Sequence, residues 1–281
     1  MKAENISNKD YPVIVITGAA SGIGQHMAKV YSHKKFNVVA TDRNIEQLKL
    51  VFSEKDNRII NEHDISLPES WNSMLANTLE RFGRVDYLLN IAAIIEPGFI
   101  FDIDLSSIDR HMDINAKGTF YGMKIIGDQM VNQGSGHIIN IASLAGVAPI
   151  YGISLYSASK YAVRGYSLAA AQELREKNIY CTVICPDLVD TPMLDQQLDY
   201  DKETALTFSG NKALTVVDIE KAIDRAMRTR QLEICVPESR GYTAKIANFL
   251  PQISFWLKSQ LISKGRANRD RIKSDRAANS L

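Results

Sequence analysis

The sequence has 281 residues, 45% of them apolar, and its 33 Lys and Arg against 32 Asp and Glu give a formal net charge of +1. A chain of this length can bury a sizeable core in one large α/β domain or two small ones, and its near-neutral charge argues against a dedicated nucleic-acid-binding protein. No charged-then-apolar leader opens the sequence and no run of about 18 apolar residues occurs in it, so we expect a cytoplasmic protein without a membrane span.

Short β-branched runs alternate with longer helical patterns along most of the chain. The predicted strands are, in order, PVIVIT, FNVVAT, RIINEH, VDYLLNIAA, GHIINIAS, IYCTVICP and LEICVP. Helical patterns separate them, and one long helix is predicted from Ser106 to Val131. Repeated βαβ units predict an α/β, doubly wound Rossmann fold with a parallel sheet of about seven strands and helices on both faces.

No linker, low-complexity tract or internal repeat divides residues 11–240, so we predict a single catalytic domain there. A flexible start is expected at residues 1–10, and a separate C-terminal segment at 241–281. Residues 187–215 lack strong periodicity and are long for a connection, which predicts a lid or substrate loop. A surface insertion with a short helix is the alternative.

The first predicted strand ends in TGAASGIG, which spaces Gly18, Gly22 and Gly24 as G-x-x-x-G-x-G immediately before a helical pattern. Glycines permit a tight turn and let the backbone approach a pyrophosphate at the helix N-terminus, where free N–H groups and the helix dipole favour an anion. The motif therefore predicts a dinucleotide-binding turn, with a plain glycine turn as the alternative.

The second predicted strand ends at Asp42, eighteen residues beyond Gly24. A carboxylate at about this distance can accept hydrogen bonds from the adenosine ribose and repel a 2′-phosphate, so NAD is favoured over NADP. The neighbouring Arg43 could pair with such a phosphate, which leaves NADP open. Asp42 could alternatively cap the next helix.

With this fingerprint in place, the sequence resembles the classical short-chain dehydrogenase/reductase family from about Tyr11 to Pro237. The resemblance rests on TGAASGIG, HDIS, INAKGTF, IASLAG and YSASK, which occur in the family's order. It implies an oxidoreductase that interconverts an alcohol and its ketone or aldehyde with NAD or NADP. The catalytic residues that it implies are Asn115, Ser143, Tyr156 and Lys160. The implied cofactor-binding residues are Gly18, Ser21, Gly22, Ile23, Gly24, Asp42, Arg43, Asp64, Ile65, Asn90, Ala92, Tyr156, Lys160, Pro186, Val189 and Thr191.

The chemistry explains why these residue types belong together. Hydride transfer at a carbonyl carbon must be coupled to proton transfer at its oxygen, and Tyr156 is the expected acid/base. A free phenol has a pKa of about 10, and Lys160, one helical turn along, is expected to favour the phenolate. Ser143 would bond the substrate oxygen, and by resemblance Asn115 would hold a water that links Lys160 to solvent.

A second Tyr-x-x-x-Lys, from Tyr31 to Lys35, lacks the companion serine that stands thirteen residues before Tyr156. The chain also departs from the family twice. Asn90-Ile91-Ala92-Ala93 replaces the usual Asn-Asn-Ala-Gly, which adds a methyl beside the cofactor wall. Pro186-Asp187 replaces Pro-Gly, and an aspartate tolerates a left-handed backbone less readily than glycine does.

The remaining expectations concern metals and partners. None of the five histidines forms a metal-spaced set with cysteines or carboxylates, so no metal centre is expected. Cys181 and Cys185 would stand about 13 Å apart on one strand, too far for a disulfide. The long predicted helix and the tyrosine helix resemble those that pair subunits in the family, which implies a homodimer or homotetramer. A non-catalytic NAD(H) sensor or scaffold is the alternative to an enzyme.

The C-terminal segment combines apolar and basic residues. A helix that begins at Pro251 would present a broad apolar surface. From Lys258 onward the sequence contains seven Lys and Arg but only two acidic residues. This pattern is typical of a segment that lies on an anionic membrane surface, and would suit a lipid-like substrate. The alternative, which the shortness of the apolar stretch favours, is packing over the pocket or a second subunit, with a solvated basic tail.

Overall fold

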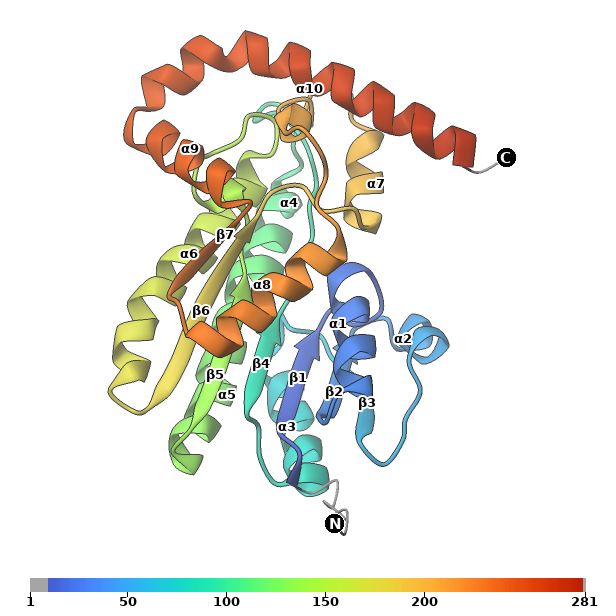
Figure 1. Cartoon of the computed structure of the whole chain (residues 1–281), viewed down its shortest axis with the longest axis vertical. Coiled ribbons are helices and arrows are strands. Elements are labelled where there is room, and N and C mark those ends of the chain that lie inside the picture. Colours follow the sequence, from blue (N-terminus) through green and yellow to red (C-terminus); the bar gives the residue numbers. More distant parts are fainter. Residues whose placement is uncertain (1–9, 280–281) are drawn as a thin grey trace, which may run out of the picture.

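The computed structural model describes residues 10–279, except for the side chains of residues 253, 254 and 279. The flexible start predicted for residues 1–10 lies outside the described residues, apart from Asp10. Seven parallel strands form one sheet in the order β3-β2-β1-β4-β5-β6-β7 (Figure 1), which confirms the predicted fold class. The strands are β1 (Val13–Thr17), β2 (Asn37–Asp42), β3 (Arg58–Glu62), β4 (Tyr87–Asn90), β5 (Gly136–Ile141), β6 (Ile179–Pro186) and β7 (Glu233–Val236).

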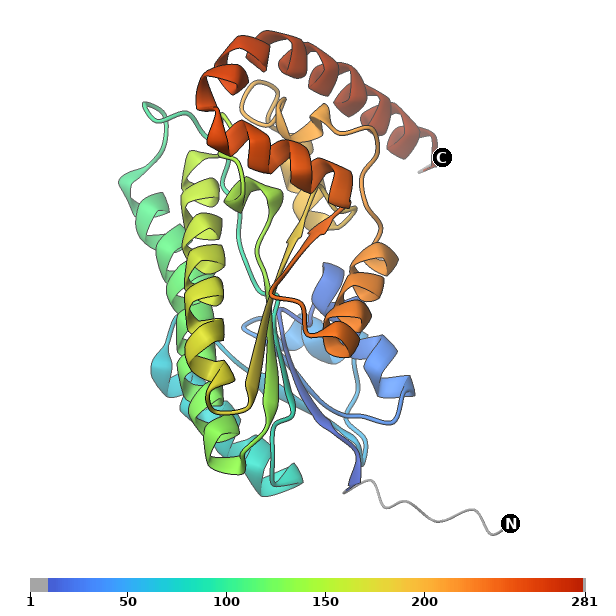
Figure 2. The same cartoon turned by 60° about the vertical axis from the view of Figure 1, so that its left-hand side comes forward.

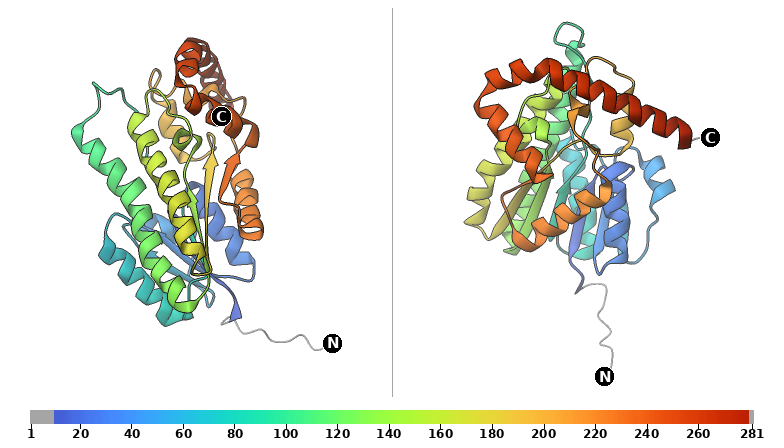
Figure 3. Two further views of the ribbon diagram at one scale, coloured as in Figure 1. Left: turned by 90° about the vertical axis from the view of Figure 1, so that its left-hand side faces the viewer. Right: turned by 45° about the horizontal axis from the view of Figure 1, so that its top comes forward.

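Helices cover both faces of this sheet, as Figure 3 shows with the sheet seen nearly edge-on. Helices α1, α2 and α8 pack on one face, and α3, α5 and α6 on the other. Figure 2 shows α5 and α6 side by side along the sheet. The helical elements are α1 (Gly22–His33), α2 (Ile45–Val51), α3 (Pro68–Phe82), α4 (Leu105–Arg110), η2 (His111–Lys117), α5 (Gly118–Gln133), η3 (Leu144–Gly146), α6 (Ser154–Arg175), α7 (Pro192–Leu198), η4 (Thr207–Ser209), α8 (Val216–Thr229), α9 (Glu238–Phe249) and α10 (Pro251–Asn279).

The central strand β1 explains the continuous apolar runs in the sequence. Val13 and Val15 join the core on the α3 side of the sheet, whereas Ile14 and Ile16 join the core on the α1 side. All four side chains are fully buried. Because successive strand residues point to opposite faces, a strand that is covered on both sides needs apolar residues at every position.

The long helix predicted from Ser106 to Val131 is present, but it is not a regular α-helix. It runs as α4, η2 and α5 without a break, and the middle segment η2 is π-helical. Asn115 lies in this segment, and π-helical turns occur frequently at functional sites. His111 starts the segment and is fully buried, and its Nε2 accepts a hydrogen bond from the backbone N–H of Glu96 at 3.2 Å.

The region after β6 contains two short helical elements, α7 and η4, and the lid or substrate-loop role of residues 187–215 stays a prediction. After β7, α9 leads into the 29-residue α10, which crosses the end of the molecule where the strands finish (Figure 1). Among the described residues, no helix has the length and apolar character needed to cross a membrane.

Two buried histidines make the stability of the fold depend on pH. Burial lowers the pKa of His63 and of His137 to about 4, from an ordinary value near 6.5. Below pH 6.5 the unfolded chain therefore binds protons that the folded chain does not, so stability falls as pH falls from 6.5 toward 4. The loss is about 3 kcal/mol for each histidine by pH 4.

We expect the free energy of unfolding, measured with urea, to fall between pH 7 and pH 5, and to fall less in a His137→Gln variant. His33→Gln is the control, because His33 lies on the surface. An equal pH dependence for His137→Gln and the wild type would contradict this assignment.

Candidate active site

A cavity of about 340 Å³ lies where the strands end, and it collects most of the residues that the sequence singled out. Open α/β sheets bind ligands at this edge. Of the predicted catalytic and cofactor-binding residues, only Asn90 and Asn115 do not line the cavity. The predicted residues that do line it are Gly18, Ser21, Gly22, Ile23, Gly24, Asp42, Arg43, Asp64, Ile65, Ala92, Ser143, Tyr156, Lys160, Pro186, Val189 and Thr191.

The glycine turn at the end of β1 is too tight for larger residues. Gly18 has a φ of +70°, which favours glycine. A Cβ on Gly24 would lie 2.1 Å from the carbonyl oxygen of Gly18, so the strand end and the first turn of α1 touch through their backbones. Ser21 precedes α1 and makes no capping hydrogen bond through its side chain. Ser21 therefore leaves the first N–H groups of α1, beside the cavity, uncapped by its side chain, and such groups suit an anion.

Asp42 at the end of β2 is fixed toward the glycine turn. Its Oδ2 accepts a hydrogen bond from the backbone N–H of Ala20 at 3.0 Å, and its Oδ1 accepts one from Asn44 at 2.9 Å. The helix α2 is capped by Asn44, whose side chain accepts from Gln47, so the capping alternative for Asp42 is wrong. Arg43 is exposed and also lines the cavity.

Asp64 and Ile65 follow β3 in a loop that its own side chains fix. The Oδ1 of Asp64 accepts hydrogen bonds from the backbone N–H and the hydroxyl of Ser66, at 2.9 and 2.6 Å. The indole N–H of Trp71 donates to the carbonyl oxygen of Ile65 at 2.9 Å. Asp64 and Ile65 of the HDIS motif are therefore held in place at the cavity wall.

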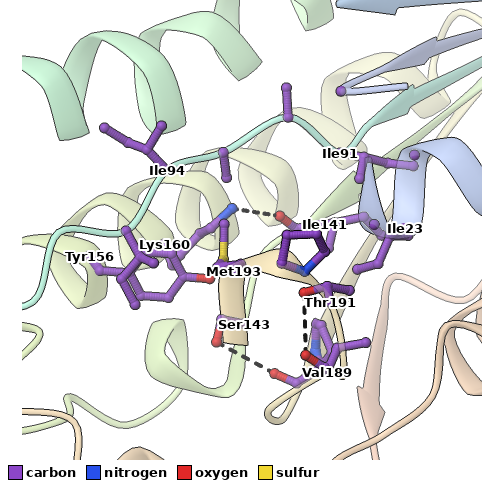
Figure 4. A pocket seen from close by; sticks show the side chains of 18 of the residues that line it. Ile23, Ile91, Ile94, Ile141, Ser143, Tyr156, Lys160, Val189, Thr191 and Met193 are labelled. Carbon is purple, nitrogen blue, oxygen red and sulfur yellow. Dashed lines mark hydrogen bonds between the residues drawn. The ribbon is translucent and has the colours of Figure 1, made fainter. Parts of the chain in front are cut away.

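Ser143, Tyr156 and Lys160 surround the same part of the cavity (Figure 4). Ser143 follows β5, and its hydroxyl lies within hydrogen-bonding reach of both Tyr156 and the carbonyl oxygen of Pro186, the latter at 3.4 Å. Lys160 lies one turn beyond Tyr156 on α6 and is almost fully buried. Its Nζ donates to the carbonyl oxygen of Ile141 at 2.9 Å and stands 5.7 Å from the centroid of the Tyr156 ring.

Burial controls the protonation of this pair. It raises the pKa of Tyr156 to about 12, against a smaller lowering by the Ser143 hydrogen bond, and it lowers the pKa of Lys160 to about 8. The expected lowering of the tyrosine pKa by the lysine is therefore not seen. In this geometry the ammonium group bonds a backbone carbonyl instead of lying beside the phenol oxygen, so desolvation has the larger effect.

The two predicted residues outside the cavity support its wall. The Asn115 side chain bonds the backbone of Ile94 in both directions, accepting from the N–H at 2.8 Å and donating to the carbonyl at 2.9 Å. It also donates to the Ser159 hydroxyl at 3.0 Å, which connects η2 to the tyrosine helix. Asn90 donates to Asn140 at 2.8 Å between β4 and β5.

The departures from the family pattern fit without strain. Ala93 lines the cavity, and the backbone of Ala92 lies directly against Gly18. Asp187 is not among the described residues with a positive φ, so it needs no left-handed backbone. Its carboxylate pairs with Arg240 at 2.8 Å, which connects the start of the loop of residues 187–215 to α9.

The wall of the cavity beside Ser143 and Tyr156 is mainly apolar. Two polar residues that also line it were not predicted from the sequence. Its apolar wall is formed by Ile94, Ile95, Leu144, Ile150, Ile153, Met193 and Leu194. Gln197 and Thr207 also line this space, and within residues 10–279 the buried oxygen atoms Oε1 of Gln197 and Oγ1 of Thr207 meet no hydrogen-bond partner. No motif marked them, because both lie in the segment whose periodicity is weak.

The basic C-terminal segment packs in part on the loop of residues 187–215, while four of its seven Lys and Arg, namely Lys264, Arg266, Arg271 and Lys273, are exposed. Arg269 is 6% exposed, and its guanidinium pairs with Asp201 of the loop. Arg276 pairs with Asp190 at the start of the same loop. The Asn268 amide donates to two loop carbonyl groups, at 3.0 and 2.6 Å. Helix α10 therefore packs on the loop of residues 187–215, part of which lines the cavity.

Comparison with known proteins agrees with this geometry. Residues 12–202 match the family model described as short chain dehydrogenase. An uncharacterized oxidoreductase of Staphylococcus saprophyticus is 31% identical over 227 residues, which cover 79% of this chain and 91% of that protein.

Solved structures show the same fold with either cofactor. A short chain dehydrogenase/reductase from Burkholderia phymatum in complex with NAD is 22% identical, with a TM-score of 0.75, and the match covers 90% of this chain and 97% of that one. The closed form of a serine dehydrogenase complexed with NADP+ is 27% identical, with a TM-score of 0.72, and covers 79% of this chain and 93% of that one.

Proposed function

This chain belongs to the short chain dehydrogenase family of oxidoreductases, and we propose that it interconverts an apolar alcohol and its ketone or aldehyde with NAD(H). One observation carries the proposal: Ser143, Tyr156 and Lys160 line the same cavity as the glycine turn and Asp42. Incubation with NAD and a panel of alcohols should produce the absorbance of reduced nicotinamide. A panel without any turnover, together with tight NADH binding, would instead favour a non-catalytic sensor or scaffold.

The cofactor would occupy the edge of the sheet from β2 to β6. The close backbone approach at Gly24 and the free N–H groups of α1 suit a pyrophosphate, and Asp42 suits the adenosine ribose. Asp64 and Ile65 would hold the adenine end, and Thr191 the nicotinamide end. When bound, NAD(H) accepts or supplies the hydride.

Side chains of the protein would transfer the proton and bind the substrate oxygen. Tyr156 takes the proton from the alcohol during oxidation and returns it during reduction. The Ser143 hydroxyl, which is within reach of Tyr156, orients the substrate oxygen. Protonated Lys160 stabilises the phenolate when the ammonium group turns from Ile141 toward the cavity.

The substrate that fits this pocket is mainly apolar. The wall from Ile94 to Leu194 offers apolar contact beside Ser143 and Tyr156. An alcohol or ketone with a bulky apolar body has this feature.

The choice between NAD and NADP depends on Asp42 and Arg43. We expect wild-type kcat/KM to favour NAD, because the Asp42 carboxylate would repel a 2′-phosphate. Asp42→Asn keeps an acceptor for Ala20 but removes the charge, so it should shift the ratio of kcat/KM values toward NADP by tenfold or more, about 1.4 kcal/mol.

Arg43→Ala is the matched control for this comparison, and it should weaken NADP use without changing NAD use. A wild-type preference for NADP of tenfold or more would overturn the assignment of Asp42, and the enzyme would then be an NADP-dependent carbonyl reductase.

Assembly and membrane contact are separate proposals. Tyr166 of α6 is 39% exposed and its ring lies tilted against that of Phe120 on α5, so these helices carry a partly exposed aromatic pair that a second subunit of a homodimer or homotetramer would cover. At the corner between α9 and α10, the side chains of Phe249, Phe255 and Trp256 are about 80% exposed. This corner supports a peripheral membrane contact, and two of the basic residues that follow it, Arg269 and Arg276, pair with the loop of residues 187–215.

Sedimentation tests both proposals. Without lipid, the protein should sediment as a dimer or tetramer at micromolar concentration. With anionic vesicles at low ionic strength, the wild type should co-sediment, and a Phe255→Ser, Trp256→Ser double variant should not, because these side chains supply the apolar contact. Wild-type protein that stays in the supernatant would exclude the membrane contact and leave the corner to protein packing.

A further inference from the structure

A pair of cysteines lies at the ends of the last two strands of the sheet. Cys185 on β6 and Cys235 on β7 are register partners in the parallel ladder. Their sulfur atoms and a carboxylate oxygen of Glu233 all lie within 4.8 Å of one another. Neighbouring strands stand about 4.8 Å apart, and a disulfide needs Cα atoms about 4.4 to 6.8 Å apart. The spacing of the backbone therefore permits a bond between the two sulfurs.

Two cations beside the pair favour thiol chemistry over metal binding. Arg164 from α6 and Lys245 from α9 both pair with Glu233. A metal ion at the cysteines would meet these two positive charges and would have to take Glu233 from them. The same charges stabilise a thiolate, which is the reactive form of cysteine.

The two thiols also differ from each other. Their mutual hydrogen bond lowers the pKa of Cys235 and raises that of Cys185. Cys235 is partly exposed, whereas Cys185 is buried. A small oxidant can therefore reach the more acidic thiol first, and the buried thiol is in place to react with the product.

We propose that Cys185 and Cys235 form a dithiol site that hydroperoxides oxidise to a disulfide. The Cys235 thiolate attacks the peroxide, so that its sulfur gains an oxygen to become a sulfenic acid and hydroxide leaves. The Cys185 sulfur then attacks the sulfenic sulfur, the S–S bond forms, and the oxygen leaves as water. In total two thiols and one hydrogen peroxide give one disulfide and two waters, and a dithiol reductant reverses the change.

The site lies directly behind the proposed cofactor pocket. Cys185 precedes Pro186, whose carbonyl oxygen accepts from Ser143, and the next N–H, of Asp187, donates to Val236 at 2.8 Å. A disulfide holds its two Cβ atoms about 3.8 Å apart, closer than strand neighbours usually stand. We expect oxidation to move the end of β6 and to weaken NADH binding several-fold.

The test uses the full-length protein, reduced, desalted and then treated with hydrogen peroxide. Peptide mapping under non-reducing conditions should join the peptides that carry Cys185 and Cys235, with the loss of two hydrogen atoms and with reversal by dithiothreitol. The Cys181→Ser variant is the control, because Cys181 is buried elsewhere on β6, and it should cross-link as the wild type does. Cys235→Ser should not cross-link.

Free thiols at both positions after peroxide treatment would overturn the proposal, as would a tightly bound zinc ion in the purified protein that blocks the oxidation. Mapping of the wild type alone decides the matter if a cysteine variant fails to fold. NADH titration of the reduced and oxidised protein tests the link to the cofactor pocket, and equal dissociation constants would overturn that link.

Discussion

Replacement of Tyr156 by phenylalanine should lower kcat about 10²- to 10⁴-fold, the usual range for the loss of a positioned acid/base. The variant keeps the ring that packs with Met193 against the cluster around Ile95, and it loses only the hydroxyl. NADH binding and the melting temperature should therefore stay close to those of the wild type. The measurement is steady-state kinetics on any alcohol that the panel identifies, with NADH affinity measured in parallel.

Tyr166→Phe is the matched control for this substitution. Tyr166 lies on the same helix. The centre of its ring is 4.2 Å from the centre of the Phe120 ring, a contact that phenylalanine can keep. Its kcat should remain within about twofold of the wild-type value. Full turnover by the Tyr156→Phe variant would remove the proposed mechanism while leaving the family assignment intact.

The sequence predicted the sheet well because each strand carries its own apolar pattern. The seven predicted runs correspond to β1 through β7, and the parallel arrangement followed from the helices between them. Many residues that line the cavity could also be predicted from the sequence, because the carboxyl ends of parallel strands meet at one edge of the sheet. Asp42 at the end of β2 was indicated by its spacing after Gly24, and Ser143 after β5 by the resemblance to the family.

Contacts between distant segments could not be predicted. Nothing near Arg269 in the chain indicates that it pairs with Asp201, so its charge was assigned to a solvated tail. The π-helical turn at Asn115 could not be predicted from the spacing of apolar residues. Its wider turn depends on how the helix packs in the folded protein. The distance between Cys185 and Cys235 depends on the register of β7, which the sequence did not fix.

The glycine turn after β1 offers the other large expected effect, because Gly24 leaves no room for a side chain there. In Gly24→Ala the added Cβ would lie 2.1 Å from the carbonyl oxygen and 2.6 Å from the carbonyl carbon of Gly18. Both atoms belong to the backbone, so no side-chain rotation relieves the contact. The first turn of α1 must move away from the end of β1 by more than about 1 Å, since ordinary carbon contacts are about 3.5 Å.

We expect the Gly24→Ala variant to bind NADH at least a hundredfold more weakly, because the N–H groups that face the pyrophosphate lose their common direction. Gly165→Ala is the same substitution within α6, where the new methyl group, the neighbouring backbone of α6 aside, meets no heavy atom of residues 10–279 within 4 Å. This control should bind NADH as the wild type does, and its helix should gain up to about 1 kcal/mol of stability. Fluorescence titration measures the affinity and thermal unfolding measures the stability. NADH affinity within twofold of the wild type in Gly24→Ala would mean that the cofactor does not approach this turn, and the dinucleotide site would have to lie elsewhere along the sheet edge.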